Sequence, residues 1–479
     1  AHGLSAAIHR REVSCREVMQ AYLARIDVLN PRFNAIVNLA PADALLAQAD
    51  VRDAELAAGR SRGWMHGMPQ AIKDAAHAAG FPTTLGCVLL KDSLATEDSL
   101  IARRAKEAGA IVVGKTNVPE FGLGSHTFND LFGCTGNAWD PTLSAGGCSG
   151  GASVALALRM LPVADGSDFM GSLRNPAGWN NVFGMRPSQG RVPGWPSPER
   201  WVSQLATEGP LARNVRDLAL LLQTQAGGDP RVPLAQAGEY RCVPADDVNT
   251  CALKGLRIGW LGDLGGHLAM EPGVLEVCQS ALSQLEGAGA VVVQPTPGFD
   301  PEQVWRAWLT WRRALSGTRV AGVMHLPDAQ RLVKPEAQWE YEQMRGLAFS
   351  DFMAASVTRT SFHASMLDLF EACDVLVLPS AQTWPFPTVE RWPRHIAGRT
   401  MDTYHRWMEV TIYASFAGLP GLAMPAGFDA TGRLPMGLQL IGKPFDDAGV
   451  LRIAAACEQV LAPVIQRQPF GSGRSIQQA

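Results

Sequence analysis

Two glycine-rich turns flank a short apolar segment in LSAGGCSGGASVALALRMLPVADGSDFMGSLRNPAG, residues Leu143–Gly178. The first turn, GGCSGG, contains Cys148 and Ser149, and the ASVALALRM that follows it predicts a helix. The second turn ends with Ser172, directly after Gly171. Glycines allow backbone conformations that are closed to other residues and let another element approach closely. Because successive backbone N–H groups in such a turn can converge on one point, this stretch predicts a site for stabilising a developing negative charge.

The bulk composition indicates a globular protein with a sizeable core. The chain has 479 residues, of which 47% are hydrophobic and 18% charged. Its net charge of −3 gives no reason to expect nucleic acid or an anionic membrane as a partner. No uninterrupted apolar run reaches the roughly 18 residues of a transmembrane helix. The nine cysteines are scattered and form no CxxC pair, so we expect neither a zinc site nor a disulfide framework, and a reducing cytoplasm is the simplest location.

Alternating helical and strand patterns predict an α/β fold. Residues 5–30 have apolar residues at helical spacing, which predicts one amphipathic helix or a pair. Residues 99–117 predict a helix, a break at Gly109 and a buried strand at Ala110–Val113. Two further short apolar runs, ACDVLVLPS and GLRIGWLG, are typical of buried parallel strands. We therefore expect a large mixed, mostly parallel sheet covered by helices on both faces.

The chain is predicted to form a single domain, residues 1–479, with excursions. The stretch Gly227–Asn249 is rich in Gly, Pro and Asp and predicts a surface connection. A helical segment around residues 300–407, rich in tryptophan from Trp305 to Trp407, predicts a cap or the wall of a pocket. These tryptophans could equally be ordinary core, so they indicate an apolar pocket only weakly.

One motif is misleading. GAIVVGKT, Gly109–Thr116, matches the phosphate-loop pattern letter for letter. The β-branched residues between its glycines favour a strand, and Pro119 interrupts the helix that should follow. We therefore interpret Lys115 as a residue at a strand end or turn rather than a nucleotide ligand.

Lys73 has two interpretations. It lies in MPQAIKDAAHAAG, surrounded by alanine and methionine. A lysine on a surface helix can extend its amine to water. If it is buried instead, desolvation lowers its pKa and makes a neutral base available.

The motifs taken together resemble the amidase signature family. The central run GGCSGGASVALAL…GSDFMGSLRNPAG…GMRPSQGRVP matches the family pattern of a G-G-S-S-G-G-[SA] turn, a helix and G-x-D-x-x-G-S-x-R-x-P-A. Other blocks of the family occur in the same order along essentially the whole chain: EVMQAYLARIDVLNPRFNAIV, GMPQAIKD, AGAIVVGKTNVPEFG, EGPLARNVRDLALLL, GLPGLAMPAG and GRLPMGLQLIG.

This resemblance implies a Ser–cis-Ser–Lys catalytic triad. Ser172 corresponds to the nucleophile and Lys73 to the base, while Cys148 occupies the bridging position, where the family has a serine after a cis peptide bond. The family's second serine is present as Ser149. No metal or organic cofactor is implied.

The remaining site residues are also implied by the resemblance. The oxyanion hole corresponds to the backbone amides of Phe169, Met170, Gly171 and Ser172, with Met170 replacing a frequent glycine. Asp168 and Arg174 are expected to support the geometry of the turn. Arg186 stands where the family more often has lysine.

Cys148 leaves three interpretations open. In the first, the thiol serves as a working proton relay. A thiol is far more acidic than an alcohol, so it could instead give its proton to Lys73 permanently and interrupt catalysis. The least favoured alternative makes the sulfur itself the nucleophile.

The sequence thus predicts an amidohydrolase that cleaves a small carboxylic amide through a Ser172 acyl-enzyme. One alternative is a family member impaired by Cys148, or a binding protein. Another is the glutamine-hydrolysing subunit of a transfer-RNA amidotransferase, which would need partner subunits. A homodimer remains open, and no cluster of basic residues in the sequence indicates an acidic substrate.

Overall fold

The computed structural model describes residues 1–241 and 250–469. The helices are α1 His2–His9, α2 Cys15–Phe33, α3 Ala42–Ala57, α4 Leu100–Glu107, α5 Gly150–Ala157, α6 Arg174–Asn180, α7 Val215–Gln225, α8 Val274–Gly287, α9 Pro301–Met324, α10 Ala329–Leu332, α11 Pro335–Arg345, α12 Phe349–Ala372, α13 Ile412–Ala417, α14 Asp447–Val460 and α15 Ala462–Ile465. The 3-10 turns are η1 Val88–Leu90, η2 Glu120–Gly122, η4 Thr250–Leu253 and η5 Arg406–Thr411.

The strands are β1 Ile36–Val37, β2 Pro69–Lys73, β3 Ile111–Thr116, β4 Phe128–Asn129, β5 Gly133–Cys134, β6 Ala164–Asp168, β7 Phe183–Arg186, β8 Thr207–Ala212, β9 Arg257–Trp260, β10 Val291–Val293, β11 Val375–Pro379, β12 His395–Ile396, β13 Arg399–Thr400, β14 Gly421–Phe428 and β15 Pro435–Ile441. Eight of them form the main sheet in the order β10-β9-β11-β15-β14-β7-β8-β6, and β1-β3-β2 form a smaller one.

The prediction of an α/β fold with a large mixed sheet is confirmed. Within the main sheet, however, only β10–β9 and β9–β11 are parallel among the described residues, and the other neighbours are antiparallel. The expectation of a mostly parallel sheet is therefore wrong. It rested on ACDVLVLPS and GLRIGWLG, which form β11 and β9 and do pair in parallel. The fully buried β11 also pairs antiparallel with β15, because a strand covered on both faces shows the same continuous apolar run in either orientation.

Local sequence signals account for several elements. The segment 5–30 forms two helices, and α2 begins with a capping box in which Ser14 and Glu17 bind each other's backbone N–H groups. Asn34 ends this helix in the left-handed region, with φ 48°. The misleading GAIVVGKT motif contributes β3, so its residues form a strand as predicted. Lys115 within it is buried and donates a hydrogen bond to the carbonyl of Ala76.

The smaller sheet lies against the edge of the main sheet. Asp165 of β6 makes this connection: one carboxylate oxygen accepts the backbone N–H of Lys73 at 3.0 Å, and the other accepts Gln70 Nε2 at 3.0 Å. The end of β2 is thereby held beside β6. Since β6 leads directly into the second glycine-rich turn, this turn begins close to the end of β2.

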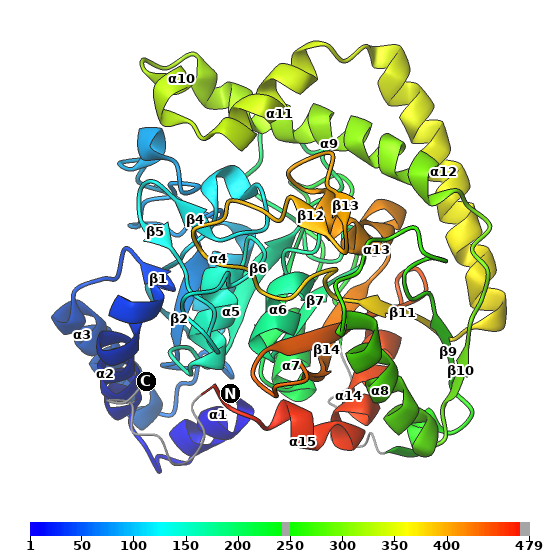
Figure 1. Ribbon diagram of the computed structural model, residues 1–479. Helices are drawn as coiled ribbons and strands as arrows, with labels where there is room; N and C mark the ends of the chain where they lie inside the picture. Colours follow the sequence, from blue (N-terminus) through cyan, green and yellow to red (C-terminus); the bar gives the residue numbers. More distant parts are fainter. Residues whose placement is uncertain (242–249, 470–479) are drawn as a thin grey trace.

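The tryptophan-rich region, predicted to be helical over residues 300–407, is helical only as far as Ala372; residues 373–405 contain β11, β12 and β13 and no helix. Figure 1 shows α9, α11 and α12 grouped along the top and right of the view. Trp305 and Trp308 of α9 are buried. None of the described helices has the length and apolarity needed to cross a membrane.

The predicted connection Gly227–Asn249 lies partly within the described residues. Residues 227–241 carry no helix or strand, whereas residues 242–249, including Cys242, lie outside the described part. The cysteines that the structure describes form no disulfide bond with one another.

Candidate active site

The two glycine-rich turns bring Ser172 and Cys148 into contact. Ser172 Oγ donates a hydrogen bond to Cys148 Sγ over 2.8 Å, and the thiol in turn donates to the carbonyl oxygen of Gly122 at 2.7 Å. Both side chains are nearly buried, with 3% of Ser172 and 6% of Cys148 exposed. The structure therefore places the predicted nucleophile and the predicted bridging residue as direct partners.

Glycines allow this close approach. Gly147 has a left-handed φ of 61°, and a Cβ there would overlap the ring of Pro176. Gly171 has φ 77°, and a Cβ there would lie 2.5 Å from Thr411 Cγ2. Any other residue at these positions would force one of the turns away from its neighbour.

The bond before Cys148 differs from the expectation. In the residues that the structure describes, the peptide between Trp195 and Pro196 is cis, and it alone is. The implied cis bond between Gly147 and Cys148 is therefore wrong for this structure. The left-handed conformations of Gly146 and Gly147, with φ 75° and 61°, turn the chain there with a trans bond.

Lys73 is buried, which resolves its two interpretations in favour of the second. Its side chain is 2% exposed, and Nζ donates to Ser149 Oγ at 2.9 Å and to Ser167 Oγ at 2.9 Å. Within the described residues no hydrogen bond joins Nζ directly to Cys148 Sγ. The expected chain of proton donors thus has an open link between Cys148 and Lys73.

The surroundings of Lys73 favour its neutral form. Burial lowers the pKa of its amine, although the charges of Cys148, Asp165 and Asp168 act in the opposite direction. Its side-chain partners are hydroxyls and a carbonyl rather than carboxylates. A lysine in these surroundings can serve as a base at a lower pH than a lysine in water.

Asp168 accepts hydrogen bonds from the backbone of the second turn. One of its oxygens accepts Gly171 N–H at 2.8 Å, and the other accepts Leu173 N–H at 3.2 Å. Arg174 donates to both oxygens at 2.9 Å. Although burial opposes ionisation, Arg174 and Arg186 lower the pKa of Asp168 to about 2. The turn is thus held by a fully paired buried charge.

Three of the four amides expected in the oxyanion hole are free. The backbone N–H groups of Phe169, Met170 and Ser172 have no acceptor among the described residues. The N–H of Gly171 is committed to Asp168, so the structure does not offer it to a ligand. Met170 contributes a backbone donor although it replaces a glycine, because an amide donor does not depend on the side chain.

Two residues in the site were missed by sequence reasoning. Ser167 shares the amine of Lys73 with Ser149, and the carbonyl of Gly122 holds the thiol of Cys148. Ser167 lies inside the quoted GSD motif, and its position directly before Asp168 could have drawn attention to it. Nothing in the local sequence indicates that Gly122 lies beside Cys148, 26 residues away.

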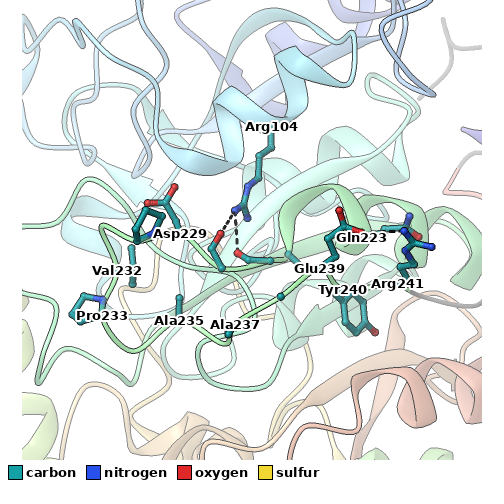
Figure 2. A pocket seen from close by; sticks show the side chains of 15 residues that line it. Arg104, Gln223, Asp229, Val232, Pro233, Ala235, Ala237, Glu239, Tyr240 and Arg241 are labelled. Atoms are coloured by element: carbon teal, nitrogen blue, oxygen red, sulfur yellow. Dashed lines mark hydrogen bonds and ion pairs between the residues drawn. The ribbon is translucent and has the colours of Figure 1, made fainter.

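A large surface cavity lies elsewhere. A cavity of about 1070 Å³ is lined by Arg104 of α4, Gln223 of α7 and the segment 226–241, and by none of the predicted catalytic residues (Figure 2). The guanidinium of Arg104 donates to the carbonyls of Gly227 and Gly228 at 3.0 and 3.3 Å. The cavity is therefore formed by a loop around an arginine whose guanidinium already donates hydrogen bonds to that loop.

The fold and this site agree with the comparisons with known proteins. The sequence model of the amidase family matches residues 17–451, and the chain belongs to this family. It is 35% identical to one of the subunits of the glutamyl-tRNA(Gln) amidotransferase of Thermosynechococcus vestitus, over 96% of this chain and 97% of that protein. It is 33% identical to an acylamidase of Rhodococcus erythropolis, over 98% of this chain and 96% of that protein.

A solved structure supports the same assignment. The crystal structure of a bacterial aryl acylamidase of the amidase signature family superimposes with a TM-score of 0.89 and 26% identity, covering 98% of each chain. The protein is therefore an amidase-signature enzyme, and the comparisons leave its substrate open.

Proposed function

We propose that the protein is an amidohydrolase that cleaves linear carboxylic amides through an acyl-enzyme on Ser172. The observation that carries this proposal is the 2.8 Å hydrogen bond from Ser172 Oγ to Cys148 Sγ, next to three free backbone N–H groups and a buried lysine. A serine hydroxyl is a weak nucleophile until a neighbouring group takes its proton during attack.

The proton movements follow from the donors and acceptors present. As Ser172 Oγ bonds to the amide carbon, its proton passes to Cys148 Sγ. The thiol releases its own proton to neutral Lys73, for which its S–H must turn from the carbonyl of Gly122 towards Nζ. The free amides of residues 169, 170 and 172 stabilise the oxyanion; such a donor is worth about 3–4 kcal/mol. The relayed proton then reaches the leaving nitrogen, the C–N bond breaks, and water hydrolyses the acyl-enzyme.

A labelling experiment tests the proposal. The protein is incubated with a fluorophosphonate probe, and the modified residue is mapped by mass spectrometry in parallel with hydrolysis of a panel of amides. We expect the probe on Ser172 and amide hydrolysis that Ser172→Ala abolishes. Modification of Cys148 with Ser172 untouched would make the sulfur the nucleophile. No modification and no hydrolysis would support a binding protein that has lost turnover.

A second candidate is a glutamine-hydrolysing component of an amidotransferase. The 35% identity to the amidotransferase component of Thermosynechococcus vestitus favours it. In that case the isolated chain should hydrolyse glutamine alone among simple amides, and partner subunits should stimulate it. Efficient hydrolysis of acyl amides by the isolated chain would reject this candidate.

A further inference from the structure

Three consecutive carbonyl groups beside the catalytic thiol each accept a hydrogen bond from a different part of the chain. In the segment 121–123, the first carbonyl accepts Arg319 Nη1 at 3.5 Å, the second accepts Cys148 Sγ at 2.7 Å and the third accepts Lys334 Nζ at 2.8 Å. Because neighbouring carbonyls lie only a few ångströms apart, the three donors must gather around one short segment. Two cations therefore lie close to the partner of Ser172.

Arg319 belongs to a helix that lines the site. On α9, the ring of Trp308 lies 5.3 Å from that of Phe169, and Arg312 Nη1 lies 3.7 Å from Met170 Sδ. Arg312 follows Trp308 by four residues, and Arg319 follows Arg312 by seven. These spacings place the three side chains on one face of the helix. This face thus extends from the oxyanion turn to the segment that holds Cys148.

The cations near the site differ in how they are compensated. Arg312 donates to Glu340 Oε1 at 2.7 Å and to the hydroxyl of Tyr404 at 2.7 Å. The backbone N–H of Lys334 binds Glu120 Oε2 at 2.9 Å, which places a carboxyl group beside this lysine. Arg319 has no carboxylate within ion-pair distance among the described residues.

Arg319 also combines solvent access with dense surroundings. Its side chain is exposed, whereas burial by the surrounding protein lowers its pKa, and its charge interacts with those of Cys148 and Arg312. Arg319 is therefore a cation in contact with solvent whose guanidinium binds the carbonyl next to the one that holds the thiol of Cys148.

We propose that Arg319 binds a carboxylate of the substrate, so that the enzyme prefers amides that carry a negative charge near the scissile bond. This inference rests on the proposed function, whose substrate class it narrows. The planar guanidinium can hold a carboxylate through two parallel hydrogen bonds, and Lys334 adds a second positive charge nearby. A charge-assisted contact of this kind corresponds to a preference of about 10- to 100-fold.

The test compares matched charged and neutral amides. Succinamate, glutaramate and adipamate are each paired with the corresponding diamide, which replaces the carboxylate by a neutral amide of similar shape. We expect a higher kcat/KM for the charged member of at least one pair. Arg319→Gln should remove this preference mainly by raising KM for the charged amide, and Arg319→Lys should restore part of it.

Arg306→Gln is the matched control. Arg306 lies on the same helix, is exposed and pairs with Glu302. In Arg306→Gln, kcat/KM for the charged amide and kcat/KM for the neutral amide should therefore both stay at the parent level. Equal kcat/KM values for charged and neutral amides in the parent, or an unchanged ratio in Arg319→Gln, would overturn the inference while the proposed function stands.

A binding measurement separates the inference from turnover. Calorimetry with Ser172→Ala, alone and combined with Arg319→Gln, measures the affinity for succinamate, glutaramate and adipamate and for their diamides. Tighter binding of a charged amide that is lost in the double variant supports the carboxylate site even if the parent hydrolyses no amide. Equal affinities for the charged and the neutral amide would overturn it.

Discussion

The two glycine-rich turns hold their polar groups in opposite ways. In the second turn, the buried Asp168 is paired with Arg174 and Arg186 and binds two backbone amides. Beside the first turn, the buried Lys73 has hydroxyls and a carbonyl as side-chain partners. A paired charge keeps its ionised form and holds a backbone in place, whereas an unpaired buried amine is free to lose and regain a proton. One turn is thus suited to fixed geometry and the other to proton transfer.

The largest effect should come from removing the amine. We expect Lys73→Met to lower kcat/KM for an amide substrate by about 10²- to 10⁴-fold, the range of a general base, while the protein remains folded. Steady-state kinetics measure kcat/KM, and circular dichroism checks that the variant is folded. An activity near that of the parent would contradict the role of Lys73 as the base.

Lys115→Met is the matched control, because Lys115 is also buried on the smaller sheet. Burial lowers the pKa of Lys115 to about 8, but its amine lies 3.8 Å from a carboxylate oxygen of Asp74. Removing this partner leaves Asp74 uncompensated. We therefore expect a loss of stability in urea unfolding that exceeds the loss of activity.

The next largest effect should be on stability. Asp168→Asn leaves Arg174 and Arg186 as uncompensated buried charges, and we expect the free energy of unfolding to fall by about 3–5 kcal/mol. Urea unfolding followed by tryptophan fluorescence measures this change. Asp50→Asn, which breaks the exposed pair with Arg16, is the control and should change it by less than about 1 kcal/mol. Equal losses of unfolding free energy in the two variants would contradict the role of Asp168 as a buried charge that holds the second turn.

Cys148→Ser should have a smaller effect, in the direction of higher activity. A serine hydroxyl is less acidic than a thiol. It therefore does not give its proton to Lys73 permanently, and no ion pair forms that would keep the base protonated. We expect kcat/KM to rise about tenfold, which is less than the roughly 10²- to 10⁴-fold contribution of general acid–base catalysis. Labelling of Ser172 by the fluorophosphonate should also become faster. A fall in both would show that the sulfur is the better relay in this site.

The smallest effect concerns the pH dependence. Glu208 of β8 pairs across strands with Ser167, and burial together with Asp165 raises the pKa of Glu208 to about 8, opposed by Lys73 and Arg104. Below this pH Glu208 is neutral. Above it, its negative charge stabilises the ammonium of Lys73, which keeps the base protonated to a higher pH.

Glu208→Gln removes that charge. Since activity rises as Lys73 loses its proton, the rising limb of log kcat/KM against pH should move to lower pH by less than about one unit. Glu458→Gln is the control, because Glu458 is another buried carboxyl group, with its pKa raised to about 7, that binds the backbone N–H of Val215 away from Lys73. A shift to higher pH, or the same shift in both variants, would contradict this role for Glu208.

The sequence by itself determined the local structure and the order of the candidate site residues. The capping box of α2, the glycine break before β3 and the GGCSGG and GSDFMGS turns depend on residues close together in the chain, so their patterns predict them. The pairing of Ser172 with Cys148 followed from the family resemblance.

Only the tertiary structure decided which distant groups meet. It directs the amine of Lys73 to Ser149 and Ser167 instead of to Cys148, and it makes most of the main sheet antiparallel. It also brings Arg319 and Lys334, which lie in no basic cluster along the sequence, to the carbonyls on either side of the one that binds the thiol of Cys148. The physical reason is that such contacts arise from the packing of helices and strands far apart in the chain, and no local pattern records that packing.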